Sequence, residues 1–346
     1  MLKLKFSFLM KTCLVGFVLI LVFAACSPDV PIVEVPSAEP TFETVTDTPT
    51  ITPTPAAQPT VLLVTGSGVD PFVTAQIQTL LASLVDDSAT KLVTLDGLTP
   101  EALTPEVQVV VGVGQNLEMN TLALSAPRTS FVVIGDPTAV VGDNVSIVGN
   151  PEDEARQLAF LAGYLSALIS SDNKVVGLIP VENAARDLLA ESFVVGARFF
   201  CGLCHPVYPP YNPFPQWELL PSAVNEEYRL VVDNFNNMGV EVVYVHGELI
   251  SPELLAYLEE LGMRVVSDRS PEALSSNWVG TVVADPLPAL EAIWPDLLLN
   301  SPGQYVPSVL MLTDQEMGLV SEGRYRLFEV MVAELQAGLA SVEITP

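Results

Sequence analysis

Positive charge is scarce in this sequence. Its 346 residues include 14 Lys and Arg against 41 Asp and Glu, which gives a formal net charge of -27. Such a chain repels phosphate backbones and anionic membrane surfaces, so nucleic-acid binding driven by counterion release is excluded as a function class. We interpret the carboxylates as a solvated exterior rather than as an acidic functional patch.

Histidines and catalytic motifs are also few. The chain has two His, at His205 and His246. It lacks a Gly-x-Ser-x-Gly elbow, a P-loop and a His-Glu-x-x-His motif, and Gly112-Val113-Gly114 lacks the third glycine of a dinucleotide fingerprint. Acid-base or triad chemistry therefore has few candidate residues, and we expect a protein that is not an enzyme.

Residues 1–25 have the pattern of an export signal. Three Lys precede an apolar run over residues 13–23 that is too short for a comfortable membrane span. The run ends in Ala24-Ala25-Cys26, which resembles the lipobox of bacterial lipoproteins. That resemblance implies lipidation of Cys26 and a lipid-anchored protein on the extracytoplasmic face of the cell membrane. An ordinary cleaved signal peptide with an incidental Cys is the alternative.

Residues 26–59 are dense in Pro and Thr and have neither a helical nor a strand period. A segment of this composition cannot bury enough apolar surface to fold, and its prolines favour extended conformations. We therefore predict a tether between the membrane and a folded body.

The folded body is predicted to be an α/β protein. Short apolar runs, typical of strands buried on both faces, alternate with amphipathic helical segments, which indicates parallel sheets. Strands are predicted at residues 61–65, 91–95, 107–113, 131–134, 175–179, 240–245, 264–267, 279–284 and 309–312. A helix is predicted over residues 71–84, with Phe72, Ala75, Leu80 and Leu84 facing inward.

A helix within residues 151–180 feeds directly into a strand and divides this series into two halves. We expect two doubly wound parallel-sheet lobes joined by a hinge, as in type I periplasmic binding proteins. The N-terminal lobe is predicted to comprise residues 60–172 plus about 305–346. The C-terminal lobe is predicted to comprise residues 173–304.

Ligands of open parallel sheets bind beyond the carboxyl ends of the strands. The candidate ligand-binding residues that follow the predicted strands are Ser67, Asp70, Gln115, Asp136, Glu182, His246, Asp268 and Asp285. Three of them have structural alternatives: Asp70 as a helix N-cap, Asp136 as a turn residue and Asp268 as the partner of Arg269 in a surface ion pair.

Three short segments resemble the basic membrane protein family of nucleoside-binding lipoproteins. They are Asp143-Asn144-Val145, the helix segment Phe160-Leu161-Ala162-Gly163-Tyr164-Leu165 and the strand Lys174-Val175-Val176-Gly177-Leu178. The resemblance extends faintly over residues 61–339. It implies a receptor that delivers a nucleoside to an ABC permease in the membrane.

The resemblance also implies roles for individual residues. The resemblance adds Phe72 to the candidate ligand-binding residues, where it would stack on the base; a core residue of the predicted helix is the alternative. Asp268 would hold the ribose, and Asp70 and Asp136 match family carboxylates. The sequence departs from the pattern at Ile179-Pro180, where the family tends to have two glycines, and at Asp285, where it has Lys. The ligand is therefore predicted only as a nucleoside-like small polar molecule.

The segment Cys201-Gly202-Leu203-Cys204-His205 does not belong to the family pattern. Removal of Cys13 with the signal and lipidation of Cys26 leave one cysteine pair outside the cytosol, so we predict a disulfide between Cys201 and Cys204. The same motif is the c-type haem attachment sequence, and covalent haem is one alternative. A metal site that uses His205 and His246 is another.

The sequence thus predicts a membrane-anchored solute-binding lipoprotein of an ABC importer, monomeric and without a cofactor. The alternative function is a sensory lipoprotein with a degenerate binding fold, or an electron-transfer protein with haem at Cys201 and Cys204.

Overall fold

The computed structural model describes residues 58–342 apart from 70, 87–89, 222–226 and 316–317. The predicted signal peptide with Cys26, residues 26–57 of the predicted tether, and Asp70 lie outside these residues. Pro55–Pro346 form one compact unit. No helix of the described part is both long and apolar enough to cross a bilayer.

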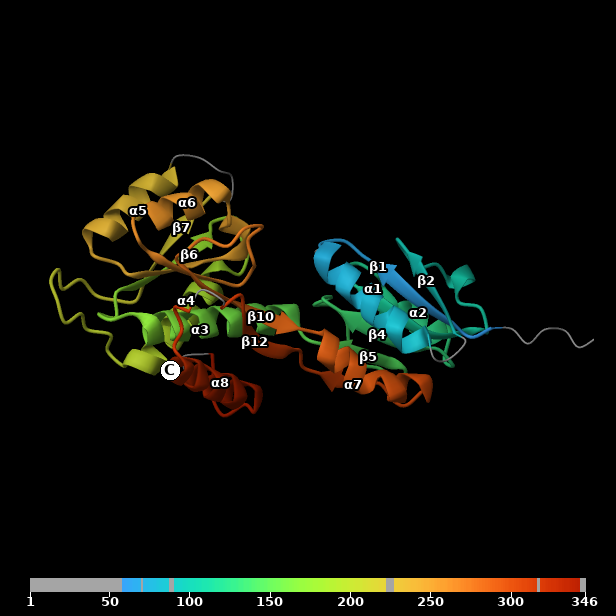
Figure 1. The fold of residues 1–346 in the computed structure, drawn as a ribbon. Coiled ribbons are helices and arrows are strands. Elements are labelled where there is room, and N and C mark those ends of the chain that lie inside the picture. The colour runs from blue at the N-terminus through green and yellow to red at the C-terminus, as the bar shows by residue number, and fades with distance from the viewer. Residues whose placement is uncertain (1–57, 70, 87–89, 222–226, 316–317, 343–346) are drawn as a thin grey trace, which may run out of the picture. The chain divides into compact units, whose positions relative to one another are not determined.

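The first lobe is a six-stranded parallel sheet with helices on both faces (Figure 1). Its order is β11-β5-β4-β3-β1-β2. The strands are β1 Thr60–Thr65, β2 Lys91–Leu95, β3 Val107–Val113, β4 Ser130–Ile134, β5 Val145–Val148 and β11 Tyr305–Val306. Helices α1 (Pro71–Asp86) and α7 (Leu287–Leu298) cover one face, and α2 (Met119–Ser125) covers the other.

The second lobe is also a six-stranded sheet, of order β12-β10-β9-β8-β6-β7, in which β12 alone is antiparallel among the described strands. Its strands are β6 Val175–Pro180, β7 Gln216–Leu220, β8 Val242–Val245, β9 Arg264–Ser267, β10 Trp278–Asp285 and β12 Val309–Thr313. One face carries α3 (Pro151–Ile169), α4 (Arg186–Cys201) and α8 (Glu322–Gln336). The other carries α5 (Glu227–Asn237) and α6 (Pro252–Glu260).

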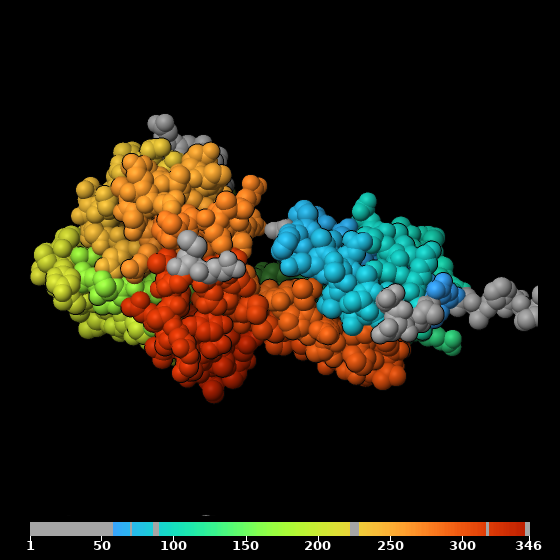
Figure 2. Space-filling model, in the orientation of Figure 1, coloured from blue at the N-terminus to red at the C-terminus, as the bar shows by residue number. Residues whose placement is uncertain are grey.

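The chain passes between the two sheets three times, after β5, after β10 and between β11 and β12. As a result the elements are divided differently from the sequence prediction. Helix α3 packs on the second sheet, α7 packs on the first, and β12 and α8 belong to the second. Figure 2 shows the orange atoms of α7 packed against the blue and cyan atoms of the first lobe. The hydrophobic period of a crossover helix shows that it packs, but not against which sheet.

Helices α3 and α4 approach each other unusually closely. A Cβ atom at Gly163 would lie 2.0 Å from the Phe193 carbonyl oxygen, and one at Gly196 would lie 1.9 Å from that of Phe160. Both positions therefore need glycine, because any side chain would collide with the backbone of the partner helix. The glycine of the Phe-Leu-Ala-Gly segment is thus a packing residue.

The buried face of α1 matches the prediction only in part: Leu80 and Leu84 pack against the core, as predicted, but the fully buried residues are others. Ile77 and Leu81 are fully buried, whereas Phe72 is 68% exposed. Ile77, Leu81 and Val85 recur every four residues and together form the stripe that enters the core. Phe72 lies in the first turn, off this stripe, so the core alternative for this residue is wrong.

Candidate ligand-binding site

At the carboxyl edge of the first sheet, the loops that follow β1 and β3 are joined. The Ser67 N–H donates to the Gln115 carbonyl at 3.2 Å, and the Gln115 N–H donates to the Ser67 carbonyl at 3.0 Å. The Asn116 amide also donates to Ser67 Oγ at 2.9 Å. Gly114 has φ +97°, and a Cβ there would lie 2.8 Å from the Ser67 carbonyl oxygen, so glycine permits this contact. The structure therefore brings two of the predicted site residues together.

A cavity of about 280 Å³ lies beside this pair of loops. Its lining residues come from the segments after β3 and β4: Asn116, Glu118, Met119, Asn120, Thr121, Asp136, Thr138 and Ala139. Asp136 is buried, and its Oδ1 accepts hydrogen bonds from the Thr138 N–H at 2.9 Å and the Thr138 hydroxyl at 2.7 Å. Asp136 therefore both forms the turn and contributes to the wall of the cavity.

At the carboxyl edge of the second sheet, Asp268 is held by its neighbours. Its Oδ1 accepts from the Gly247 N–H at 2.6 Å, and its Oδ2 accepts from the Tyr244 hydroxyl at 3.2 Å. Oδ2 also lies 3.6 Å from Nε2 of His246, whose Nδ1 accepts from the Glu248 N–H. These contacts replace the surface ion pair with Arg269 that the sequence left open.

Burial raises the pKa of Tyr244 well above its ordinary value, and the adjacent Asp268 carboxylate raises it further. The Tyr244 hydroxyl therefore keeps its proton and donates a hydrogen bond to Asp268. The Tyr244 ring stacks on Phe193, with ring centroids 5.5 Å apart. Because both ends of Tyr244 are held, the Asp268 carboxylate has a fixed orientation.

Three more hydrogen bonds extend this edge. The Asn183 amide, after β6, donates to the Glu248 carboxylate at 3.1 Å. Asp314, after the antiparallel β12, accepts at 2.5 Å from the hydroxyls of both Ser270 and Thr281. Thr281 pairs with the last residue of β9, so Asp314 reaches the same edge as Asp268.

The remaining predicted residues are not part of these contacts. Asp285 lies beyond this edge, where its Oδ1 accepts from the Leu287 N–H in the first turn of α7. Glu182 is exposed in the loop after β6. Phe72 is exposed in the first turn of α1, directly after the loop that contains Ser67. The sequence did not indicate Asn116, Tyr244 or Asp314, although Tyr244 could have been noticed as the one polar side chain in an otherwise all-valine strand.

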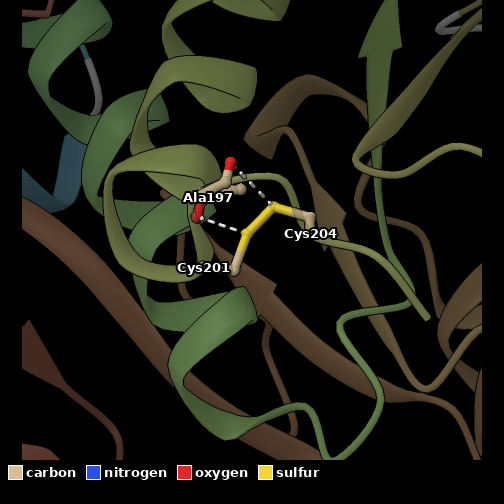
Figure 3. Close-up of a disulfide and its surroundings, with 4 residues drawn as sticks. Ala197, Cys201 and Cys204 are labelled. Atoms are coloured by element: carbon tan, nitrogen blue, oxygen red, sulfur yellow. Dashed lines mark hydrogen bonds between the residues drawn. A yellow bond between two sulfur atoms is a disulfide. The ribbon is translucent and has the colours of Figure 1, made fainter. Parts of the chain in front are cut away.

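Cys201 and Cys204 form a disulfide at the C-terminal end of α4, with their Cα atoms 4.9 Å apart (Figure 3). Cys204 is 1% exposed, and His205 beside it is exposed. Both ring nitrogens of His246 face protein groups, as described above. Within the described residues, no group of three or more His, Cys, Asp and Glu side chains could hold a metal ion.

The structure resembles solved proteins of one fold. A transcriptional activator of the comK gene from Bacillus halodurans superimposes with a TM-score of 0.56 and 15% identity, covering 81% of this chain and 98% of the other. An ABC transporter solute-binding protein from Aeropyrum pernix K1 gives 0.55 and 14%, covering 83% and 94%. No protein-family model matches the sequence, and no curated protein does.

The chain thus has the two-lobed α/β fold of periplasmic-binding-protein-like domains, and the predicted fold class is confirmed. At these identities the likeness establishes the fold alone, because one fold carries many functions.

Proposed function

We propose that the protein is an extracytoplasmic solute receptor that binds a nucleoside-like polar ligand and delivers it to an ABC permease. The main support is that both sheets carry polar side chains at their carboxyl edges, where open parallel sheets bind ligands. A structural neighbour is described as an ABC solute-binding protein, which is consistent with this role. The proposal includes no catalysis and no cofactor.

The chemistry of the edges favours a neutral ligand that is rich in hydroxyl groups. Asp136 and Asp268 are hydrogen-bond acceptors with fixed orientations, and carboxylates repel anionic ligands. Gln115 and Asn116 are exposed amides that can both donate and accept hydrogen bonds. Phe72 adds an exposed aromatic face on which a flat ring can stack.

Thermal unfolding with a panel of nucleosides, sugars and amino acids tests the proposal. A ligand at 100 times its dissociation constant raises the free energy of unfolding by about 2.7 kcal/mol. We expect a nucleoside to produce this shift. No shift with any member of the panel would contradict the proposed ligand class.

Two variants locate the site. Gln115→Ala should weaken binding up to about tenfold and Asp268→Asn about tenfold or more, because a neutral hydrogen bond contributes about 0.5 to 1.5 kcal/mol and one to a carboxylate about 1.5 to 3 kcal/mol. Glu322→Gln is the matched control, because this carboxylate is 80% exposed on α8 and pairs with Arg326. Equal affinities in all three variants would place the ligand elsewhere.

We also propose that Cys26 is lipidated and holds the body at the membrane through the Pro/Thr-rich tether. Metabolic labelling with a fatty acid should modify the full chain and should fail in Cys26→Ser. Release of a soluble, unlabelled protein from unmodified cells would instead indicate an ordinary cleaved signal peptide.

One observation favours the alternative of a sensory lipoprotein. The side chains of His246 and Asp268 are only 10% and 13% exposed, because they contact each other and their own loops. Low exposure of its polar side chains is what we expect of a degenerate site that no longer binds a solute. If ligand panels give no shift and the protein co-purifies with a membrane kinase rather than a permease, the sensory function replaces the receptor.

A further inference from the structure

A loop between α4 and β7 exposes an unusual number of apolar side chains. Leu203 is 77% exposed, Val207 63%, Tyr208 65% and Tyr211 70%. We call residues 203–211 the apolar loop. In Figure 1 it lies within the yellow-green segment that projects from the second lobe beyond α4, and in Figure 2 the same colour forms a bulge there.

The apolar loop is fixed to the lobe by a buried ion pair. Lys174 Nζ lies 2.8 Å from Asp172 Oδ2, and both side chains are 5% exposed. Asp172 Oδ1 accepts from the Tyr208 N–H at 3.1 Å and from the Val207 N–H, and Lys174 Nζ donates to the Pro209 carbonyl at 3.4 Å. A buried pair is tolerable only when its remaining hydrogen-bonding capacity is used, and here the backbone of the loop uses it.

The disulfide adds a second restraint. The bond between Cys201 and Cys204 closes the turn that carries Leu203, and Cys204 itself is almost fully buried. The exposed side chains therefore stand on a backbone that is held from both sides. A surface that is already ordered loses little conformational entropy when it binds a partner, and exposed apolar patches commonly mark such surfaces.

The charge of this region contrasts with the rest of the chain. No Asp or Glu occurs between Glu191 and Glu218, although the protein contains 41 of them. The charged or titratable side chains in that interval, apart from tyrosine and cysteine, are Arg198 and His205. The segment that presents the apolar side chains is thus free of the carboxylates that would resist transfer into a less polar medium.

We propose that the apolar loop binds the interfacial layer of a zwitterionic lipid bilayer. Tyrosine has an apolar ring and a polar tip and is enriched at the level of the headgroups, where Tyr208 and Tyr211 would lie. Irregular backbone cannot enter the hydrocarbon region, so only the side chains penetrate and insertion is shallow. The contact does not depend on lipidation of Cys26 and would orient the second lobe against the membrane.

Vesicle sedimentation tests this proposal. The body Pro55–Pro346 is used, because it is a compact unit with hydrophobic cores of its own and lacks the apolar run of residues 13–23. We expect it to sediment with phosphatidylcholine vesicles. The triple variant Leu203→Ser, Tyr208→Ser, Tyr211→Ser should partition about tenfold less or lower still, because it loses most of the apolar area that the bilayer would cover.

A matched control separates the loop from general surface hydrophobicity. Leu124 and Leu230 are 84% and 75% exposed on α2 and α5. The double variant Leu124→Ser, Leu230→Ser should bind vesicles like the unaltered body. Because all five side chains are exposed, both variants should keep the melting temperature of the body, which confirms that they are folded.

A second arm uses the net charge. Replacing a quarter of the lipid with phosphatidylglycerol should weaken binding at low salt, because the acidic body is repelled, and 0.5 M NaCl should remove the difference. Equal binding by the triple variant and the control would overturn the proposal. So would absence of vesicle binding combined with a concentration-dependent dimer that only the triple variant loses, because the loop would then bind a second copy of the chain.

Discussion

The hydrogen bond between Tyr244 and Asp268 supports a first prediction about the second edge. Tyr244→Phe removes the hydroxyl that donates to Asp268 Oδ2 at 3.2 Å and keeps the ring that stacks on Phe193. Shape and apolar burial are nearly unchanged, so the loss is that of one hydrogen bond to a carboxylate whose side chain is 13% exposed. Bonds of this kind contribute about 1.5 to 3 kcal/mol, and we expect that destabilisation.

Chemical denaturation at pH 7 measures this change, with Tyr257→Phe as the control. Tyr257 donates to the Asp233 carboxylate in the same manner, but on the surface of the lobe, where solvent screens the interaction. We therefore expect the control to lose clearly less stability. Equal losses in the two variants, or none in Tyr244→Phe, would refute the view that the buried bond fixes the Asp268 edge.

The contact between Tyr244 and Asp268 also predicts how the free energy of unfolding depends on pH. Because burial raises the pKa of Tyr244 in the folded protein, its contribution to stability is complete below about pH 10, the pKa of an unfolded tyrosine. Above that pH the unfolded chain ionises and the folded one does not, so stability falls with pH by up to about 1.4 kcal/mol per unit. Tyr244→Phe should lose less stability than the unaltered protein between pH 10 and 11, and parallel curves would contradict the assignment.

Two further predictions concern packing and the crossover after β5. Gly163→Ala should destabilise by about 1 to 3 kcal/mol in denaturation experiments, because its Cβ would meet the Phe193 carbonyl; Gly323→Ala, with nothing within 4 Å, should be neutral or stabilising, and the opposite order would contradict the close packing. Burial raises the pKa of Glu154 in the folded protein, so the contribution of this carboxyl to stability is complete below about pH 4.5 and is lost as pH rises through the folded pKa. Glu154→Gln should remove this loss from curves of the free energy of unfolding measured between pH 4 and 7. An unchanged curve would contradict the raised pKa of Glu154.

Periodicity was sufficient to predict most of the body, but not its division into lobes. Strands such as β4 and β8 are continuous runs of buried residues, and a run of this kind can be predicted from the sequence without knowledge of its partner strand. The association of α3 with the second sheet and of α7 with the first depends on contacts between residues far apart in the chain. The short strand β7 was missed because it follows a proline-rich segment, which is typical of a loop.

The candidate site was predicted only in outline, for a physical reason. The rule that ligands bind beyond strand ends led to Ser67, Gln115, Asp136 and Asp268, and the structure places all four at such ends. Asp314 follows the last predicted strand but was not selected, and its contacts with Ser270 and Thr281 depend on the antiparallel pairing of β12 with β10, which joins residues far apart in the chain. The rule also cannot distinguish a ligand-facing carboxylate from one that accepts a backbone N–H at the start of a helix, which is the contact that Asp285 makes with Leu287.

The two edges differ in how much of their hydrogen-bonding capacity remains available. On the second sheet, Asp268 already accepts from Gly247 and Tyr244, so its remaining lone pairs suit a hydrogen-bond donor. On the first sheet, the backbones of Ser67 and Gln115 bind each other, while their side chains are exposed. A solute that contacts both edges must donate hydrogen bonds to Asp268 on the second sheet. It must both donate hydrogen bonds to, and accept them from, the exposed side chains on the first sheet. Ribose hydroxyls together with a base satisfy both conditions, whereas a simple anion satisfies neither, and this asymmetry is why a nucleoside-like ligand is the first compound to test.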